Sequence, residues 1–325
     1  MSMGYAIAFS DIEAARARIE GRVHRTPVLT SSTLDRLAKG HRGDECKLFF
    51  KCENLQRVGA FKIRGAMNAV LALSDEEARH GVVTHSSGNH AQALALAARE
   101  RGIPCHVVMP ITAPKSKRAA VAGYGARVYE CEPTVSARAA GAMRVCSETG
   151  AHFVAPFDSP YVMAGQGTAA WELLEQISDL DAIITPVGGG GLLSGCSVAA
   201  KHVSPGIRMF GAEPSGADDT ARSKAAGKRL ANERVNTIAD GLLTNVGELT
   251  WPVIDELVEA VFTVTDDQIV DAMRTVWERM KLIIEPSAAV PVAVVLSEQF
   301  RALGLRRVGV VLSGGNVDLT KLPFK

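Results

Sequence analysis

Four short motifs in the sequence combine residue types that could bind an anion or react with a carbonyl group. Four consecutive glycines, Gly188 to Gly191, follow an apolar run and precede a predicted helix. Glycines at such a junction let the backbone approach a ligand closely, and the N–H groups at a helix start favour negative charge. The segment therefore predicts an anion site, most simply for phosphate. It matches neither the dinucleotide fingerprint nor the P-loop, so both of those readings are disfavoured.

A second motif, His85-Ser86-Ser87-Gly88-Asn89-His90, also lies where a predicted strand meets a helix. Its hydroxyl, amide and helix N–H groups could hold a carboxylate, although the same residues also suit an ordinary N-capping turn. The third motif places Lys62 between Phe61 and Ile63. A lysine removed from water has a lowered pKa and can form a Schiff base, whereas an exposed lysine at a helix start would have no such role.

The fourth motif, Leu312-Ser313-Gly314-Gly315-Asn316, follows another apolar run. It would either direct the Ser313 hydroxyl toward a cleft or form a plain turn. A phosphate site, a carboxylate site, a candidate Schiff-base lysine and a serine hydroxyl together suit a phosphorylated aldehyde that acts on amino acids. This combination predicts pyridoxal phosphate as the cofactor.

The elements that must position these motifs alternate between short β-branched runs and helical stretches, as in a parallel sheet covered by helices. The predicted strands span residues 81–86, 105–109, 127–131, 152–155, 182–187, 208–212, 261–265 and 307–312. The predicted helices span residues 91–101, 115–122, 136–149, 168–177, 192–202 and 287–300, with one more that has Asp266 as its N-cap. We therefore expect an α/β protein of two lobes, with ligands in the cleft between them.

Composition disfavours several other classes of protein. The chain has 325 residues, of which 47% are hydrophobic and 22% charged, as in a globular protein of about two domains. A net charge of +1 and an aromatic content of 5% argue against nucleic-acid partners and anionic membrane surfaces. The six scattered cysteines form no C-x-x-C pair, which favours reduced thiols in a cytoplasmic protein. The sequence predicts neither a membrane span nor a secretory signal.

The sequence as a whole resembles the pyridoxal-phosphate-dependent serine racemase and serine/threonine dehydratase family, and within it the eukaryotic-type racemases. The resemblance covers residues 5 to about 319 and includes all four motifs. It also includes residues 26–32, 164–168, 250–252, 277–282 and 284–286. It implies a tryptophan-synthase-beta-like α/β fold with parallel-type sheets flanked by helices and the active site in the interdomain cleft. The implied domains are a large cofactor-binding domain, residues 1–80 plus 159–325, and a small inserted domain, residues 81–158.

The resemblance also implies roles for single residues. Lys62 would hold the cofactor as a Schiff base and act as base on one face of the substrate, and Ser87 would be the acid and base on the other face. The implied cofactor-binding residues are Phe61, Lys62, Asn89, Gly188, Gly189, Gly190, Gly191 and Ser313. The implied substrate-binding residues are Ser86, Ser87, Asn89, His90 and Arg138. The resemblance places the neutral Ser313 hydroxyl beside the pyridine nitrogen of the cofactor. The cofactor ring would then withdraw electrons less strongly than with an aspartic acid at that position.

Residues 213–219 resemble the family's divalent metal site. Glu213, the Ala217 carbonyl and Asp219 would supply hard oxygen ligands for Mg²⁺, or for Ca²⁺ or Mn²⁺, although two carboxylates in a loop also suit a solvated turn. The resemblance further implies a homodimer. It makes ATP doubtful as an effector, because Arg57 and Val58 stand where the animal enzymes have lysine and threonine.

The implied function is serine racemase, which interconverts L- and D-serine and also eliminates water from serine or threonine, giving a keto acid and ammonia. Two alternatives share the same residues: a 3-hydroxyaspartate ammonia-lyase and a catabolic threonine dehydratase. A catalytically silent relative that serves as a binding protein is a third alternative, against which the presence of Lys62 argues. Phe157 and Asp158 look more like dehydratase residues than like those of the animal racemases.

Overall fold

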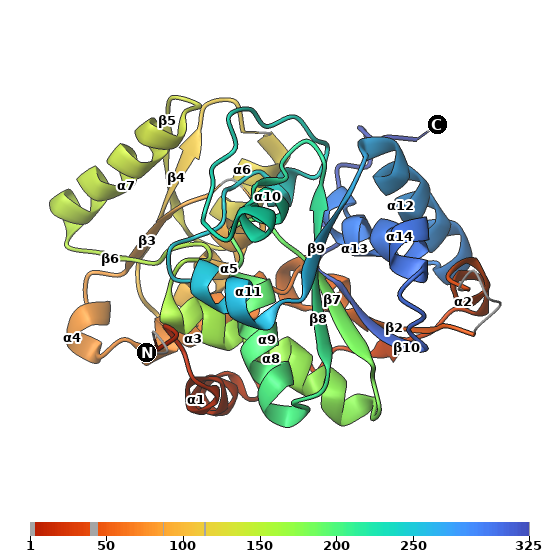
Figure 1. The fold of residues 1–325 in the computed structure, drawn as a ribbon. Coiled ribbons are helices and arrows are strands. Elements are labelled where there is room, and N and C mark those ends of the chain that lie inside the picture. Colours follow the sequence, from red (N-terminus) through yellow and green to blue (C-terminus); the bar gives the residue numbers. More distant parts are fainter. Residues whose placement is uncertain (1–3, 40–44, 87, 114, 325) are drawn as a thin grey trace.

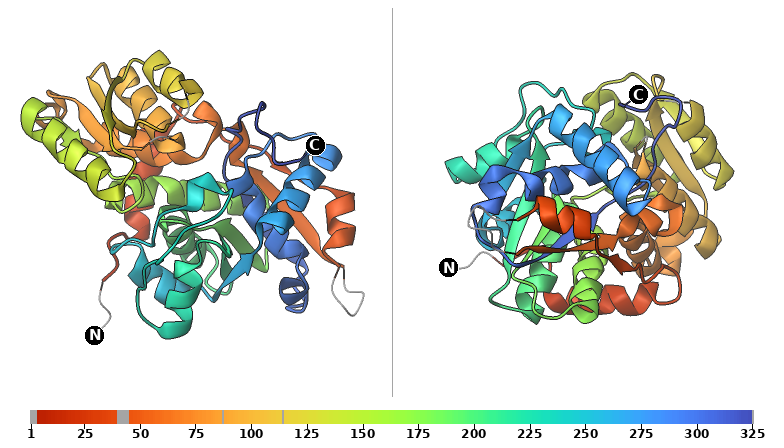
Figure 2. Two further views of the ribbon diagram at one scale, coloured as in Figure 1. Left: turned by 90° about the horizontal axis from the view of Figure 1, so that it is seen from above. Right: turned by 90° about the vertical axis from the view of Figure 1, so that its right-hand side faces the viewer.

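Two sheets lie side by side in the computed structural model, which describes residues 4–39, 45–86, 88–113 and 115–324 (Figure 1 and Figure 2). The large sheet has the strand order β1-β2-β10-β7-β8-β9, and the small sheet has the order β5-β4-β3-β6. β1 pairs antiparallel with β2, and the other pairs among the described strands are parallel. The fold is therefore an α/β fold dominated by parallel pairing, as predicted.

The elements have the following bounds. The large sheet consists of β1 (Val28–Leu29), β2 (Lys47–Cys52), β7 (Ala182–Pro186), β8 (Arg208–Pro214), β9 (Ala260–Val264) and β10 (Arg307–Leu312). The small sheet consists of β3 (Val82–His85), β4 (Cys105–Pro110), β5 (Arg127–Cys131) and β6 (His152–Phe153). The helices are α1 (Phe9–Ile19), α2 (Ser32–Leu37), α3 (Lys62–Ala72), α4 (Asp75–Ala78), α5 (Asn89–Arg101), α6 (Lys115–Gly123), α7 (Val135–Thr149), α8 (Pro160–Gln176), α9 (Gly191–Val203), α10 (Asp219–Ala226), α11 (Trp251–Leu257), α12 (Asp266–Met280), α13 (Pro286–Leu296) and α14 (Glu298–Arg301). Short 3₁₀ helices are η1 (Glu53–Leu55), η2 (Arg57–Gly59) and η3 (Asp240–Leu242).

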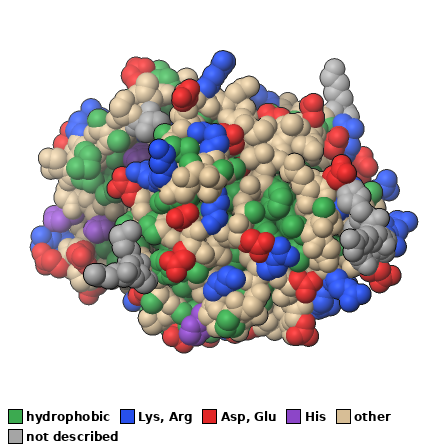
Figure 3. Space-filling model, viewed as in Figure 1, with side chains coloured by type: hydrophobic (Ala, Val, Ile, Leu, Met, Phe, Trp, Pro, Cys, Tyr) green, Lys and Arg blue, Asp and Glu red, His purple; other side chains and the backbone are tan. Residues whose placement is uncertain are grey.

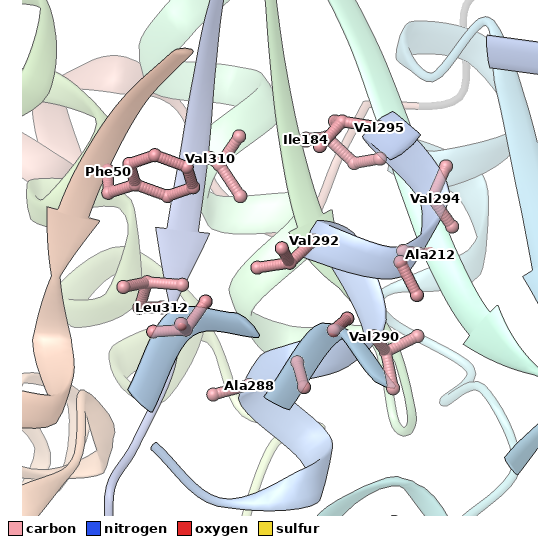
Figure 4. Close-up of a cluster of buried hydrophobic side chains, with 14 of the residues drawn as sticks. Phe50, Ile184, Ala212, Ala288, Val290, Val292, Val294, Val295, Val310 and Leu312 are labelled. Carbon is pink, nitrogen blue, oxygen red and sulfur yellow. The ribbon is translucent and has the colours of Figure 1, made fainter. Parts of the chain in front are cut away.

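Side chains of the large sheet are buried on both of its faces. Val310 and Leu312 of β10 join one cluster of apolar side chains, whereas Val311 between them joins the cluster on the opposite face. Figure 4 shows part of the first cluster, where side chains from β2, β7, β8 and β10 pack against α13. The second cluster contains residues of α1, α8 and α9. Because helices cover both faces, the central strands are apolar along nearly their whole length.

The small sheet is covered in the same way. Val82 and Val107 face a cluster that includes α3 and α5, and Val83 faces α7 on the other side. Helix α3 packs against α8 as well as α5, so it lies between the two sheets. The domain boundaries at residues 81 and 158 stay a prediction. Helix α3, which begins with Lys62, contacts helices that pack on each of the two sheets.

A buried cluster of charged side chains anchors α3 to its neighbours. Arg64 makes two hydrogen bonds of 2.8 Å to Glu53 of η1 and two of 2.8 Å to Glu172 of α8. Lys51 of β2 donates to Glu172 at 2.8 Å, so two positive and two negative groups balance one another. Arg64 is only two residues beyond Lys62, and this ionic cluster therefore fixes the start of α3.

The predicted strands are all present, with ends that differ from prediction by no more than two residues. Three helix predictions were wrong. Helix α8 begins at Pro160, eight residues earlier than predicted; the cap of α12 is Thr265, whose hydroxyl accepts the Gln268 N–H; and the segment 287–300 is two helices. The last break occurs where the Ser297 side chain caps α14.

Among the described residues, none of the helices combines the length and apolar character needed to span a bilayer. Figure 3 shows acidic and basic side chains interspersed over the face seen in Figure 1, without a broad field of one sign. This distribution agrees with the net charge of +1.

Candidate active site

Lys62 is the first residue of α3, and its side chain is partly buried. The Nζ atom donates a hydrogen bond of 2.7 Å to the carbonyl oxygen of Pro156 and lies 5.1 Å from the centre of the Phe61 ring. Burial lowers the pKa of Lys62 to about 8, although the nearby Glu285 carboxylate acts in the opposite direction. A sizeable fraction of this amine is therefore neutral in mildly basic solution, as a nucleophile requires. The alternative of an exposed lysine at a helix start is wrong.

The four glycines lie between β7 and α9 as predicted, with Gly191 as the first residue of the helix. Gly190 has a φ of +87°, a conformation that favours glycine. A Cβ atom on Gly189 would come within 2.2 Å of the Phe157 ring. The Thr250 hydroxyl donates to the Gly189 carbonyl at 2.8 Å and so holds the loop from the other side. The loop presents the N-terminus of a 13-residue helix, which suits a phosphate group.

The segment from Ser86 to His90 leads from β3 into α5. The Ser86 hydroxyl accepts the Gly88 N–H at 3.3 Å, and the His90 ring lies 3.3 Å from the Val154 carbonyl, to which Nε2 must donate. Burial, followed by the charge of Lys62, lowers the pKa of His90 to about 3, so the imidazole is neutral. Ser87 lies outside the described residues, and its role stays a prediction.

Asn89 connects the small sheet to residues of the large one. Its Nδ2 donates to the two carboxylate oxygens of Glu285 at 2.9 and 3.1 Å, and its Oδ1 accepts from Asn316 at 2.9 Å. Burial raises the pKa of Glu285 to about 7, and Asp240 adds to this effect. Ser313 is buried at the end of β10.

The structure thus brings most of the predicted cofactor residues together. The Ser313 carbonyl accepts the Phe61 N–H at 3.0 Å, which joins the fourth motif to the turn that carries Lys62. Sequence reasoning missed Glu285 and Asn316 as residues of the site. Both lie in segments that carry the family resemblance, but neither position shows a chemical role until the chain is folded.

Arg138 lies in the first turn of α7, the helix that packs against the small sheet. Its Nε donates to the Thr134 carbonyl of its own helix at 3.4 Å. Its charge also helps burial to lower the pKa of His85, the residue before Ser86. Arg138 therefore lies near the end of β3, from which the segment Ser86 to His90 continues, and its contact with substrate stays a prediction.

Glu213 near the end of β8 and Asp219 at the start of α10 lie close together. Glu213 accepts the N–H groups of Thr220 and Ala221 at 3.1 and 2.8 Å, and burial together with Asp219 raises its pKa to about 8. Asp219 accepts the Val246 N–H at 2.8 Å. No group of three or more acidic, histidine or cysteine side chains within the described ranges could hold a metal. Two buried carboxylates that lie close together nevertheless fit a hard cation that keeps several waters.

A lysine with a lowered pKa, a glycine loop for an anion and a convergent set of polar side chains lie where the two sheets meet. These features define an α/β enzyme that binds a phosphorylated aldehyde. The family model of pyridoxal-phosphate-dependent enzymes matches residues 19–314. The chain belongs to this family, and pyridoxal phosphate is its cofactor.

Individual relatives are similar over nearly the whole chain. Serine racemase from Dictyostelium discoideum is 51% identical, with 97% of each chain covered. The beta-hydroxyaspartate dehydratase of Paracoccus denitrificans is 47% identical over 98% of this chain and 99% of its own. The structure of maize serine racemase superposes with a TM-score of 0.94 at 49% identity, covering 97% of this chain and 95% of that one.

Capture of pyridoxal phosphate by the apoenzyme is expected to accelerate as the pH rises through about 8, because the neutral Lys62 amine is the reacting form. Stopped-flow absorbance in the visible range, from about pH 6 to about pH 10, measures this rate. In Glu285→Gln the midpoint should move to lower pH, because the Glu285 carboxylate raises the Lys62 pKa. A wild-type midpoint above about 10, the range of an exposed lysine, would contradict the prediction.

Proposed function

We propose that this chain is a pyridoxal-phosphate-dependent serine racemase that interconverts L- and D-serine and also eliminates water from serine or threonine. The observation that carries the proposal is the Lys62 amine, whose pKa burial lowers to about 8. This amine lies close enough to His90, in the segment predicted to hold the substrate carboxylate, for its charge to lower the His90 pKa. The serine racemases among its relatives support the choice of substrate.

Each residue of the site has a part in this reaction. When bound, the cofactor withdraws electrons from the α-carbon of the amino acid and makes its α-proton acidic. Lys62 would remove that proton, while Ser86, Asn89 and the start of α5 hold the carboxylate. The neutral His90 ring adds no positive charge that would repel the lysine. Ser87 would return a proton on the opposite face for racemisation, and loss of the β-hydroxyl would give elimination.

A second candidate is a 3-hydroxyaspartate ammonia-lyase. The Paracoccus dehydratase is nearly as similar to this chain as the Dictyostelium racemase is. Arg138, whose charge acts on His85 at the end of β3, would bind the additional carboxylate of that substrate.

One experiment separates the two. The holoenzyme is assayed with Mg²⁺ on L-serine, L-threonine and the hydroxyaspartate stereoisomers, following D-serine and keto acid together. D-serine formed by wild type but not by Ser87→Ala supports the racemase with Ser87 as its second base. Rapid oxaloacetate release from one hydroxyaspartate isomer, with far slower turnover of serine, would replace it with the ammonia-lyase.

We also propose that Glu213, Ala217 and Asp219 bind Mg²⁺, with Ca²⁺ or Mn²⁺ as substitutes. Addition of the cation should then raise the Tm by several degrees, since saturation at about 100 times Kd stabilises a protein by about 2.7 kcal/mol. Thermal unfolding with EDTA and with Mg²⁺ measures the difference. Glu213→Gln should abolish the response. Asp218→Asn is the control, because Asp218 pairs with Arg222. An equal response in Glu213→Gln and wild type would contradict the site.

Assembly, location and regulation complete the proposal. We expect a cytoplasmic homodimer that acts on a small hydroxy amino acid and has no nucleic-acid or membrane partner. ATP is disfavoured as an effector because Arg57, one of the two departures, is already engaged. Its guanidinium donates to the Arg22 carbonyl at 2.6 Å and pairs with Glu100.

A further inference from the structure

Asn316 sits at the centre of a chain of hydrogen bonds that crosses the active site. Its Nδ2 donates to the Val58 carbonyl at 2.7 Å and to Asn89 Oδ1 at 2.9 Å. Asn89 in turn donates through Nδ2 to Glu285. We call this chain, Val58–Asn316–Asn89–Glu285, the amide relay.

The chemistry of its two ends fixes the direction of the amide relay. The Val58 carbonyl can only accept, so Asn316 must turn its NH₂ group toward it. The second hydrogen of that group points to Asn89, which must therefore present its oxygen there. The Asn89 NH₂ group is then directed to Glu285, whose carboxylate oxygens accept. Reversing either amide would place two acceptors face to face in a partly buried site.

The backbone around Val58 is bent to make this contact. Val58 is β-branched and yet has a φ of +56°, in the left-handed region that such residues avoid. Gly59 follows with a φ of +71°, and a Cβ atom there would come within 2.6 Å of Asn316 Oδ1. The Gly315 N–H also donates to the Gly59 carbonyl at 2.9 Å. Unfavourable backbone conformations that persist next to a reactive lysine indicate a functional constraint.

The relay leaves one hydrogen of Asn89 for a ligand. A single N–H directed between the two Glu285 oxygens accounts for the contacts of 2.9 and 3.1 Å. The Asn89 nitrogen carries a second hydrogen, and the ring hydroxyl oxygen of pyridoxal phosphate needs a donor when it is ionised.

We propose that Asn316 is a positioning residue that holds the Asn89 amide with its NH₂ group, rather than its oxygen, toward the ring oxygen of the cofactor. The proposal rests on the proposed function only in that Asn89 contacts the cofactor. It concerns the orientation of one side chain and holds for either candidate substrate.

The test compares Asn316→Asp with a matched variant of a neighbouring segment. An aspartate at 316 offers no donor to Val58 or Asn89, so Asn89 would be forced to turn. Asn54→Asp is the control: Asn54 is also a buried amide, donates to the Ile283 carbonyl at 3.1 Å and packs against Gly315, outside the amide relay. Apoenzymes of both variants and wild type are titrated with pyridoxal phosphate, and the visible spectrum of the bound cofactor is recorded against pH.

Asn316→Asp should weaken cofactor binding about tenfold or more and move the pH midpoint of the bound spectrum upward, because a donor to an ionised oxygen stabilises that form. Its kcat should fall more than its KM rises. For Asn54→Asp, cofactor affinity, kcat and KM should each stay within about twofold of wild type, and the pH midpoint should not move. Equal changes in the two variants, or an unchanged midpoint in Asn316→Asp, would overturn the proposal. Should Asn316→Asp fail to fold, Asn316→Ala gives the same comparison without the added charge.

The cofactor titration also separates this proposal from the proposed function. Absence of turnover on serine by wild type would refute the racemase, while the difference in cofactor affinity and spectrum between Asn316→Asp and Asn54→Asp would still decide the role of Asn316.

Discussion

Lys62→Ala is expected to lower turnover of every substrate by roughly 10⁴-fold or more, and to remove the visible absorbance of covalently held cofactor. The side chain supplies both the amine that captures the aldehyde and the base that removes the α-proton. The Tm should change little, because the amine is a desolvated charge with a single hydrogen bond, to the Pro156 carbonyl. Absorbance spectra, turnover and thermal unfolding of the purified variant measure the three effects.

Lys51 is the matched control for this experiment. It is also buried with a lowered pKa, but its three donors are satisfied by the Thr26 carbonyl, Glu172 and Gln176 at 2.8 to 2.9 Å. Lys51→Met should therefore cost about 3–5 kcal/mol of stability, because Glu53 and Glu172 would then share Arg64 as their one cationic partner in the cluster. The folded fraction should keep its visible absorbance. Retained absorbance in Lys62→Ala, or its loss in folded Lys51→Met, would mean that the reactive lysine has been misassigned.

The second large effect is expected for Gly189→Ala. The added Cβ atom would lie 2.2 to 2.4 Å from three atoms of the Phe157 ring, so the loop must shift away from its anion-binding geometry. Overpacking of this kind costs about 1–3 kcal/mol, equivalent to a roughly 5- to 150-fold loss of cofactor affinity. Titration of apoenzyme with pyridoxal phosphate measures the loss.

A double variant identifies the cause. Combining Gly189→Ala with Phe157→Ala removes the colliding ring, and cofactor affinity should then recover at least in part. If the double variant binds no better than Gly189→Ala alone, the loss arises from backbone conformation rather than from the ring.

The sequence was most informative where one residue type has one physical meaning. Apolar β-branched runs predicted the strands of the small sheet and four strands of the large one, but β1 and β2 were not predicted. The position of the glycine loop was predicted correctly, and its binding of phosphate stays a prediction. The first half of α8 was missed because Gly165 and Gly167 lower helix propensity. Both glycines are required by close packing: a Cβ atom on Gly165 would meet the Arg64 carbonyl at 2.6 Å, and one on Gly167 the Gly195 carbonyl at 2.7 Å.

The parts of the site that could not be predicted depend on contacts between distant segments. Glu285 and Asn316 acquire their roles only when the segments after β3, before α13 and after β10 meet. The sequence likewise did not decide whether Lys62 is buried. A lysine at a helix start gives no sign of whether the folded chain will cover it, as the segment at Pro156 does here. The local sequence pattern predicts helices and strands, whereas the removal of a side chain from water depends on how distant segments pack around it.

The ionic cluster beneath α3 has an evolutionary consequence. Lys51, Glu53, Arg64 and Glu172 neutralise one another with little contact with bulk water, so loss of any one leaves an uncompensated charge. Exchange of the whole set for apolar residues of similar volume carries no such penalty. Among proteins that descend from this chain, these four positions are therefore expected either to stay unchanged or to change together. A change at one of them alone would weaken the anchoring of α3.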